Sequence, residues 1–172
     1  MFKTIGAVCI LLWGSWIGFA IAKKYRERPK QLQQLLIAFK ILETEISYHA
    51  QPLPIALQNV GKRVAMPIAV LFLETAERLS KSEGRPLSEY WSAAVDEMLQ
   101  EAALLDADGE LLRQFGFTLG SSDRQDQIQH IHGVCEMLRV SEEQAREEQA
   151  RLEKMWKYLG AVTAVILVIL LY

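Results

Sequence analysis

The stretch that decides the fold begins with Leu119-Gly-Ser-Ser-Asp-Arg-Gln-Asp-Gln-Ile128 and runs to Tyr172. Gly120 suits the end of one helix, because glycine adopts positive φ without steric cost. Ser122 or Asp123 then suits the cap of the next helix, and Gln125 completes the spacing of a capping box. The apolar residues that follow are spaced as on one face of a single helix: Ile128, Ile131, Cys135, Leu138, Ala145, Leu152, Trp156 and Leu159.

This helix continues without a loop into an apolar segment, residues 159–172, where the sequence ends. Such a helix is on the order of 75 Å long at the α-helical rise per residue. The apolar part spans only about 21 Å, so the interfacial residues Trp156, Lys157 and Tyr158 help it to match a bilayer. The pattern predicts a soluble helix that becomes a C-terminal transmembrane helix.

A second apolar segment, residues 5–22, carries no charge and is long enough to cross a membrane. The alternative is a cleaved signal peptide that ends at Ala20-Ile-Ala22. Basic residues follow the segment at once, and basic residues stay on the cytoplasmic side: Lys23, Lys24, Arg26, Arg28 and Lys30. This excess favours an N-terminal transmembrane helix over residues 1–22. Residues 23–158 are then cytoplasmic, and both termini are outside.

Small residues within the two apolar segments predict contact between helices. Gly14 and Gly18 are separated by one helical turn, as are Gly160 and Ala164. This spacing lets two helix backbones approach closely in a membrane, although glycine is also common in membrane helices in general.

The middle of the chain reads as several short helices separated by proline and glycine. We expect a cytoplasmic bundle over residues 23–140 with about six helices, and a charged helical stalk over residues 141–158. The expected core residues lie at helical spacing: Leu32, Leu35, Leu36, Phe39, Leu42, Ile46, Ile55, Leu57, Val60, Val64, Ile68, Leu71, Phe72, Ala76, Leu79, Leu87, Trp91, Ala94, Val95, Met98, Ala102, Leu111, Leu112, Phe115 and Leu119.

Residues 74–110 carry ten acidic side chains against three basic ones, a net charge of −7. Such a surface suits a basic partner, and the candidate partner-binding residues are Glu89, Glu97 and Glu101. Glu43 and Glu45, on different sides of the first cytoplasmic helix, are a second candidate. The alternative is that these acidic residues only solvate the bundle.

The sequence contains no pattern typical of a catalytic or cofactor-binding site. His130, His132 and Cys135 are close together, but a metal site needs more ligands. The net charge of −2 gives no sign of nucleic-acid binding. We therefore expect a protein that is not an enzyme and has no cofactor or metal.

Several segments resemble the stage III sporulation protein AB family, in order and from end to end. They are Trp16-Ile-Gly-Phe19, Glu27-Arg-Pro-Lys-Gln31, Leu42-Glu-Thr-Glu-Ile-Ser-Tyr48, Gln114-Phe-Gly-Phe-Thr-Leu-Gly-Ser-Ser-Asp-Arg124 and Glu153-Lys-Met-Trp-Lys-Tyr-Leu-Gly160. The family is similar to the F proteins of type II secretion, which are membrane platforms whose helical bundles meet the secretion ATPase. This chain has one such bundle where the F proteins have two.

The resemblance implies a platform in a channel-like complex between mother cell and forespore during endospore formation. Its implied partners are the stage III sporulation ATPase (protein AA), other membrane subunits of the complex, a possible second copy of the chain, and the lipid bilayer. The implied location is the cell membrane, with the bundle in the mother cell cytoplasm, at the outer forespore membrane. The alternative is a membrane-anchored sensor or regulator that binds a soluble signalling protein.

Overall fold

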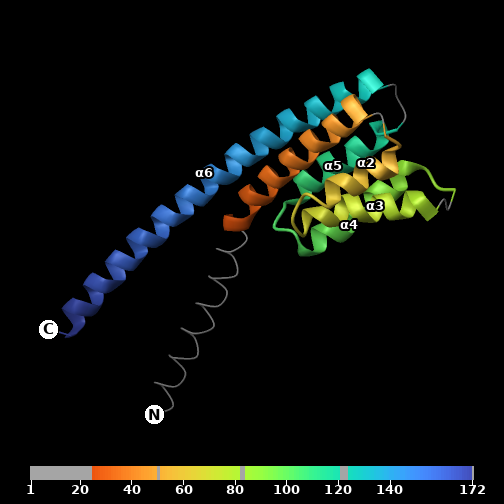
Figure 1. Cartoon of the computed structure of the whole chain (residues 1–172). Helices are drawn as coiled ribbons and strands as arrows, with labels where there is room; N and C mark the ends of the chain where they lie inside the picture. The colour runs from red at the N-terminus through yellow and green to blue at the C-terminus, as the bar shows by residue number, and fades with distance from the viewer. Residues whose placement is uncertain (1–24, 50, 82–83, 121–123, 172) are drawn as a thin grey trace, which may run out of the picture.

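The computed structural model describes residues 25–49, 51–81, 84–120 and 124–171, which form a helical bundle without strands (Figure 1). An α-helix over residues 25–44, here called helix 25–44, continues into a π-helical turn, η1 (Glu45–His49). It is followed by α2 (Leu53–Gly61), α3 (Ile68–Lys81), α4 (Leu87–Glu101), α5 (Asp106–Thr118) and α6 (Arg124–Leu171). The prediction of an all-α bundle of six helices is confirmed for the described residues.

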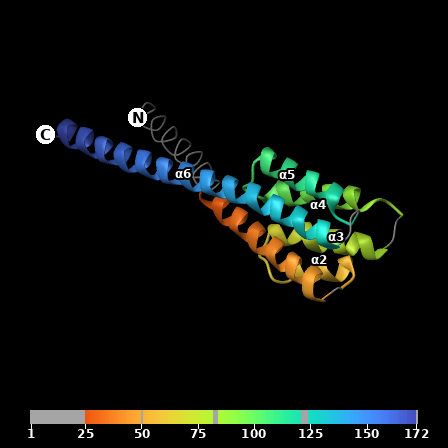
Figure 2. The same cartoon turned by 90° about the horizontal axis from the view of Figure 1, so that it is seen from above.

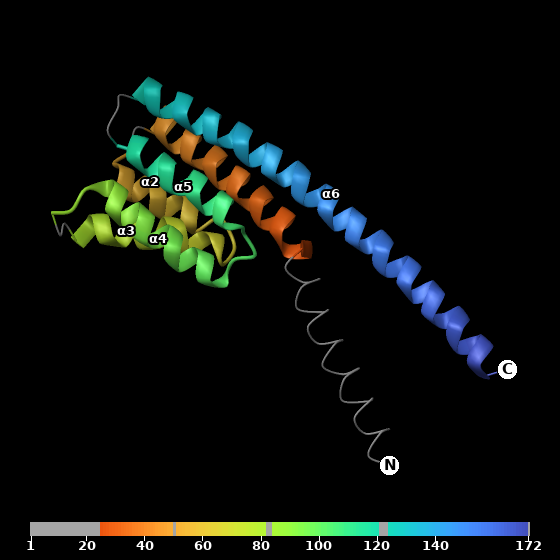
Figure 3. The same ribbon diagram turned by 180° about the vertical axis from the view of Figure 1, so that it is seen from behind.

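Helix 25–44 and α6 lie side by side and run in opposite directions (Figures 1 and 3). Arg28 contacts Glu148 near one end of this pair, and Glu43 contacts His132 near the other. The 16 residues from 28 to 43 thus lie alongside the 17 residues from 148 back to 132 on α6. Residue 25, at the start of helix 25–44, and the point where α6 extends beyond the other helices therefore lie at the same end of the bundle.

The single long helix predicted after a cap at Ser122 or Asp123 is confirmed over Arg124–Leu171, which is α6, and it extends well beyond the other helices (Figure 2). Within the part of the chain that the structure describes, no helix meets the length and hydropathy expected of a membrane span. Residues 1–24 lie outside that part. The two flanking transmembrane helices therefore stay predictions.

Four aromatic rings form the centre of the bundle. Phe39, Phe72, Trp91 and Phe115 meet edge to face, with ring centroids 5.0 to 6.1 Å apart. Trp91 is fully buried, and its indole Nε1–H donates to the Leu112 carbonyl oxygen at 2.7 Å. This bond satisfies the one polar group that burial of the indole would otherwise leave unpaired. The prediction that Trp91 and Phe115 belong to the core is confirmed.

Proline and glycine mark the helix ends much as the sequence predicts. α2 and α4 begin directly after Pro52 and Pro86. Gly120, just after α5, has φ of 78°, which confirms its role as a helix stop; Ser122 and Asp123 lie outside the described residues. The sequence places Val64 in the second helix, but α2 ends at Gly61 and Val64 lies in the connection to α3.

Candidate interaction surfaces

The acidic face predicted over residues 74–110 is largely held in ion pairs. Arg78 of α3 contacts Glu97 of α4, and it also lies 3.5 Å from Glu74. On α5, Arg113 donates to Asp96 of α4 at 2.7 Å. This bond raises the pKa of Arg113. These arginines join α3 to α4 and α4 to α5 along the outer surface.

Two further acidic residues of the same range are also engaged. Glu77 accepts a hydrogen bond from Lys81 one turn further along α3, which lowers the pKa of the Glu77 carboxyl. Asp108 counts among the acidic residues of the predicted face, but it is only 1% exposed. The net charge of −7 therefore overstates the negative charge that a partner would meet.

Glu89 and Glu101 are the exposed acidic residues of α4 that have no ion-pair partner among the described residues. Glu97 lies between them in sequence, at eight residues from Glu89 and four from Glu101, so the three share one side of the helix. The side chain of Glu97 is 44% exposed and is bound to Arg78. Of the three predicted partner-binding residues, Glu89 and Glu101 are thus the more available to a partner.

Glu43 and Glu45 have separate partners within the bundle. The carboxylate of Glu43 lies 3.0 Å from Nε2 of His132 on α6. Glu45 is 2% exposed, accepts from Nδ2 of Asn59 at 3.1 Å, and lies 3.6 Å from the Arg63 guanidinium. Both residues tie helix 25–44 and its π-helical turn to neighbouring elements, and their predicted role in partner binding stays a prediction.

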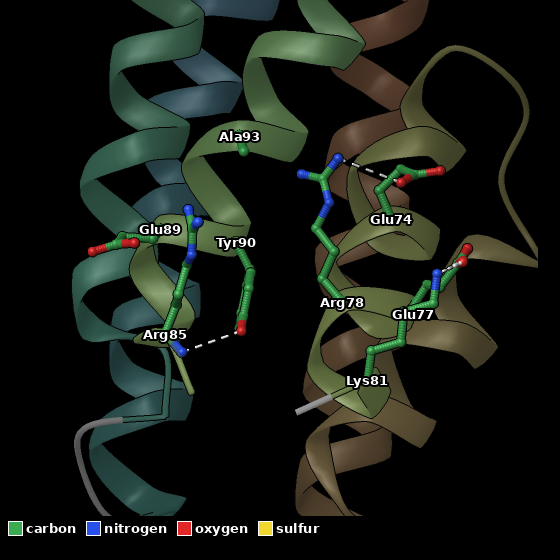
Figure 4. A pocket seen from close by; sticks show the side chains of 8 residues that line it. All are labelled: Glu74, Glu77, Arg78, Lys81, Arg85, Glu89, Tyr90 and Ala93. Atoms are coloured by element: carbon green, nitrogen blue, oxygen red, sulfur yellow. Dashed lines mark hydrogen bonds and ion pairs between the residues drawn. The ribbon is translucent and has the colours of Figure 1, made fainter. Parts of the chain in front are cut away.

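An open cleft of about 330 Å³ lies between α3 and the start of α4 (Figure 4). Its six charged side chains are three acidic and three basic: Glu74, Glu77, Arg78, Lys81, Arg85 and Glu89. Arg78 points toward Glu74 and Lys81 toward Glu77, while the backbone N–H of Arg85 donates to the Tyr90 hydroxyl at 3.2 Å. This balance of charge gives the cleft no preference for an anion or a cation.

Cys135 is the one cysteine among the described residues, and it is partly buried on α6. Burial, and to a smaller extent the nearby Glu43 carboxylate, raises the pKa of its thiol to about 11. A thiol of this kind is a poor nucleophile at neutral pH. Among the residues that the structure describes, no three His, Cys, Asp or Glu side chains are placed to hold a metal ion.

Sequence reasoning missed a buried ion pair between Arg28 and Asp108. The Nε and Nη2 of Arg28 donate to Oδ2 and Oδ1 of Asp108 at 3.0 and 3.2 Å. The backbone N–H of Leu105 also donates to Asp108 at 2.9 Å, so Asp108 caps α5 from within its first turn. The second carboxylate beside Arg28 is that of Glu148, 3.4 Å from Nη1 of Arg28. Arg28 counts among the basic residues that follow the first apolar segment, but it is 6% exposed and neutralised.

Comparison with known proteins identifies the family. The model of the stage III sporulation protein AB family matches residues 3–172. The chain belongs to this family. Stage III sporulation protein AB of Bacillus subtilis (strain 168) is 38% identical to it over 171 residues, which are 99% of each chain. The prediction from the sequence is thereby confirmed, and it supports a role in sporulation.

A solved structure of stage III sporulation protein AB shares the fold. It is 34% identical in sequence and superposes with a TM-score of 0.67. The match covers 73% of this chain and 98% of the solved one. The family's proteins are named for sporulation and not for a reaction.

Proposed function

We propose that this chain is a non-enzymatic platform of a secretion-like complex between mother cell and forespore. Its helical bundle docks the cytoplasmic ATPase of the complex, protein AA, while its terminal segments lie in the membrane beside other subunits. Membership of a sporulation protein family over the full length supports the cellular setting. The resemblance to the F proteins of type II secretion supports the docking role.

The observation that carries this proposal is the shared end of helix 25–44 and α6. Arg28 lies against Glu148, so residue 25 and the C-terminal part of α6 lie at the same end of the bundle. The apolar segments 5–22 and 159–172 both follow from this end. Two segments that start together can enter the same membrane and leave the whole bundle on one side of it.

Basic residues next to the apolar segments support a cytoplasmic bundle. Arg26 and Lys30 keep side chains that are 65% and 60% exposed, although Arg28 is buried. Lys23 and Lys24 precede them, and Lys154 and Lys157 precede the second apolar segment. Exposed basic residues beside a membrane helix hold their segment in the cytoplasm. The bundle would then face the ATPase.

Reversal of charge on α4 tests the docking face. The variant Glu89→Lys/Glu101→Lys should bind protein AA about 2- to 30-fold more weakly at low salt, since exposed charge pairs each contribute about 0.2–1 kcal/mol. The loss should shrink at high salt, where exposed charges are screened. Binding of the full-length chain in detergent to purified ATPase is titrated at two salt concentrations.

Glu143→Lys/Glu147→Lys on α6 is the matched control, because it makes the same change of charge at two exposed residues. Glu97→Lys is avoided, since it would place a lysine against Arg78 and unsettle the α3–α4 contact. Equal affinities and salt slopes for all three proteins would contradict docking through α4. A pull-down from sporulating cells could instead recover a soluble signalling protein and no ATPase. That result would favour the alternative function, a membrane-anchored sensor or regulator.

A further inference from the structure

Helix 25–44 carries a row of exposed residues on the side away from the bundle core. The row, called here the basic stripe, has members at intervals of three or four residues, which share one side of a helix: Lys30, Gln33, Ile37 and Lys40. Ile37 is 50% exposed. Lys30 binds Glu27 at 3.0 Å in an exposed pair, and Lys40 has no ion-pair partner among the described residues. The stripe therefore offers positive charge on both sides of an apolar residue.

α6 carries a second exposed row, which is acidic. This acidic stripe has the same kind of spacing: Glu136, Val140, Glu143 and Glu147. Val140 is 56% exposed. Within the described part of the chain, Glu143 and Glu147 have no ion-pair partner. Glu136 contacts Arg139 at 3.1 Å, but both side chains are about two-thirds exposed or more, at 71% and 67%, and such a pair contributes little. The stripe therefore offers negative charge on both sides of an apolar residue.

The two stripes lie at matching heights along the bundle. The contacts of Arg28 with Glu148 and of Glu43 with His132 set the register of the two antiparallel helices. By this register, four pairs of residues are level to within about one residue, or about 1.5 Å of helix: Lys30 and Glu147, Gln33 and Glu143, Ile37 and Val140, and Lys40 and Glu136.

Both stripes face outward on one side of the molecule. Helix 25–44 and α6 lie side by side and form the side of the bundle away from α3 and α4 (Figures 1 and 3). Each stripe is on the exposed side of its helix, so the stripes of one chain lie next to each other and do not face each other. A second copy, turned by half a turn about an axis parallel to the bundle, brings each basic stripe opposite an acidic stripe at unchanged height.

We propose that the chain pairs with a second copy of itself through this face. The basic stripe of each copy meets the acidic stripe of the other, and Ile37 of one copy packs against Val140 of the other. Opposite charges and matched spacing are the features that fix register and orientation between two surfaces. In this pair, residue 25 of both copies lies at the same end. The contact leaves α4 uncovered, so it goes beyond the docking proposed for α4 and does not depend on it.

Charge reversal in each stripe tests the pairing. Sedimentation of the full-length chain in detergent micelles measures the dissociation constant of the dimer. The variants Lys30→Glu/Lys40→Glu and Glu136→Lys/Glu147→Lys should each dimerise about fourfold or more weakly at low salt, because each loses four exposed ion pairs per dimer. The melting temperature should stay at the wild-type level, since all the changes are at exposed residues.

An equal mixture of the two variants is the decisive sample. In a mixed dimer, the reversed basic stripe meets the reversed acidic stripe, and the two unchanged stripes meet each other. The mixture should therefore dimerise as strongly as wild type, although each variant alone does not. Glu89→Lys/Glu101→Lys on α4 is the matched control, and it should leave dimerisation at the wild-type level. Conversely, the stripe variants should bind protein AA as wild type does.

Three results would overturn the pairing. One is a wild-type chain that stays monomeric in micelles. Another is a dissociation constant that neither stripe variant changes. The third is two weakened variants that do not recover on mixing, since a contact between these stripes requires recovery. None of these results bears on docking through α4, which is measured by the affinity of Glu89→Lys/Glu101→Lys for protein AA.

Discussion

At Gly120 the backbone conformation and a neighbouring side chain together disfavour any residue larger than glycine. Its φ is 78°, and a Cβ there would lie 2.8 Å from Cδ2 of Leu87. Gly120→Val therefore adds backbone strain to a steric clash, and we expect a loss of about 1 kcal/mol or more. For a chain of this size, that lowers the melting temperature by at least about 2–4 °C. Circular dichroism during heating measures the change.

Gly133→Ala is the control for this experiment. Gly133 lies within α6, and nothing would lie within 4 Å of its Cβ. Alanine there should stabilise the helix by about 0.5–1 kcal/mol. A melting temperature of Gly120→Val equal to that of wild type would contradict the role of Gly120 as a helix stop.

Cys135 should react slowly with alkylating reagents. Burial raises the pKa of its thiol from 9.0 to about 11, so the reactive thiolate is about 100-fold rarer at neutral pH than for an ordinary cysteine. The alkylation rate should keep rising with pH until about pH 11. Gln144→Cys in a Cys135→Ser background supplies an exposed thiol on the same helix for comparison.

The same shift has a consequence for stability. The folded state holds the Cys135 proton more tightly than the unfolded state. The contribution of the protonated thiol to the stability of the fold is therefore complete below pH 9 and is lost as the pH rises through about 11.

If Cys135 and the cysteine introduced by Gln144→Cys were alkylated at equal rates at about pH 7.5, the burial of the Cys135 thiol would be contradicted.

At the scale of helices, sequence periodicity predicted helix 25–44 and α2 to α6 in their order, because amphipathic spacing and proline are local signals. Trp91 and Phe115 could be assigned to the core for the same reason. The π-helical turn Glu45–His49 could not be predicted, since the segment Leu42–Tyr48 keeps an ordinary helical pattern. It carries Glu45 into contact with Asn59 and Arg63.

The candidate sites were harder to predict than the helices. Residues 80 positions apart form the Arg28–Asp108 pair, and no local pattern reports on such a contact. Asp108 therefore appeared as one of many surface acidic residues, and Arg28 as one of many basic residues. Asp96 and Glu97 of α4 likewise depend on arginines of α5 and α3. A count of charge along the sequence measures what is present, whereas the fold decides what remains exposed.

At the scale of the whole molecule, the antiparallel pair of helix 25–44 and α6 constrains the topology. Residue 25 and the C-terminal part of α6 lie at the same end of the bundle, so the chain enters and leaves the bundle on one side. Because the described residues include no helix that fits a membrane span, the topology needs a direct measurement.

Labelling of introduced cysteines provides that measurement. Natural Cys9 and Cys135 are first replaced by serine, and single cysteines are then placed at exposed Lys40, Gln100 and Gln144 or after Tyr172. In intact cells, an impermeant thiol reagent should label the C-terminal cysteine and leave the other three unreacted, because the membrane encloses the cytoplasm. Permeabilised cells supply the control, in which all four should react.

Labelling of residues 40, 100 and 144 in intact cells would place the bundle outside, where a cytoplasmic ATPase has no access to α4. Protection of the C-terminal cysteine together with the other three would instead show that α6 does not cross the membrane, while leaving docking through Glu89 and Glu101 open to its own test.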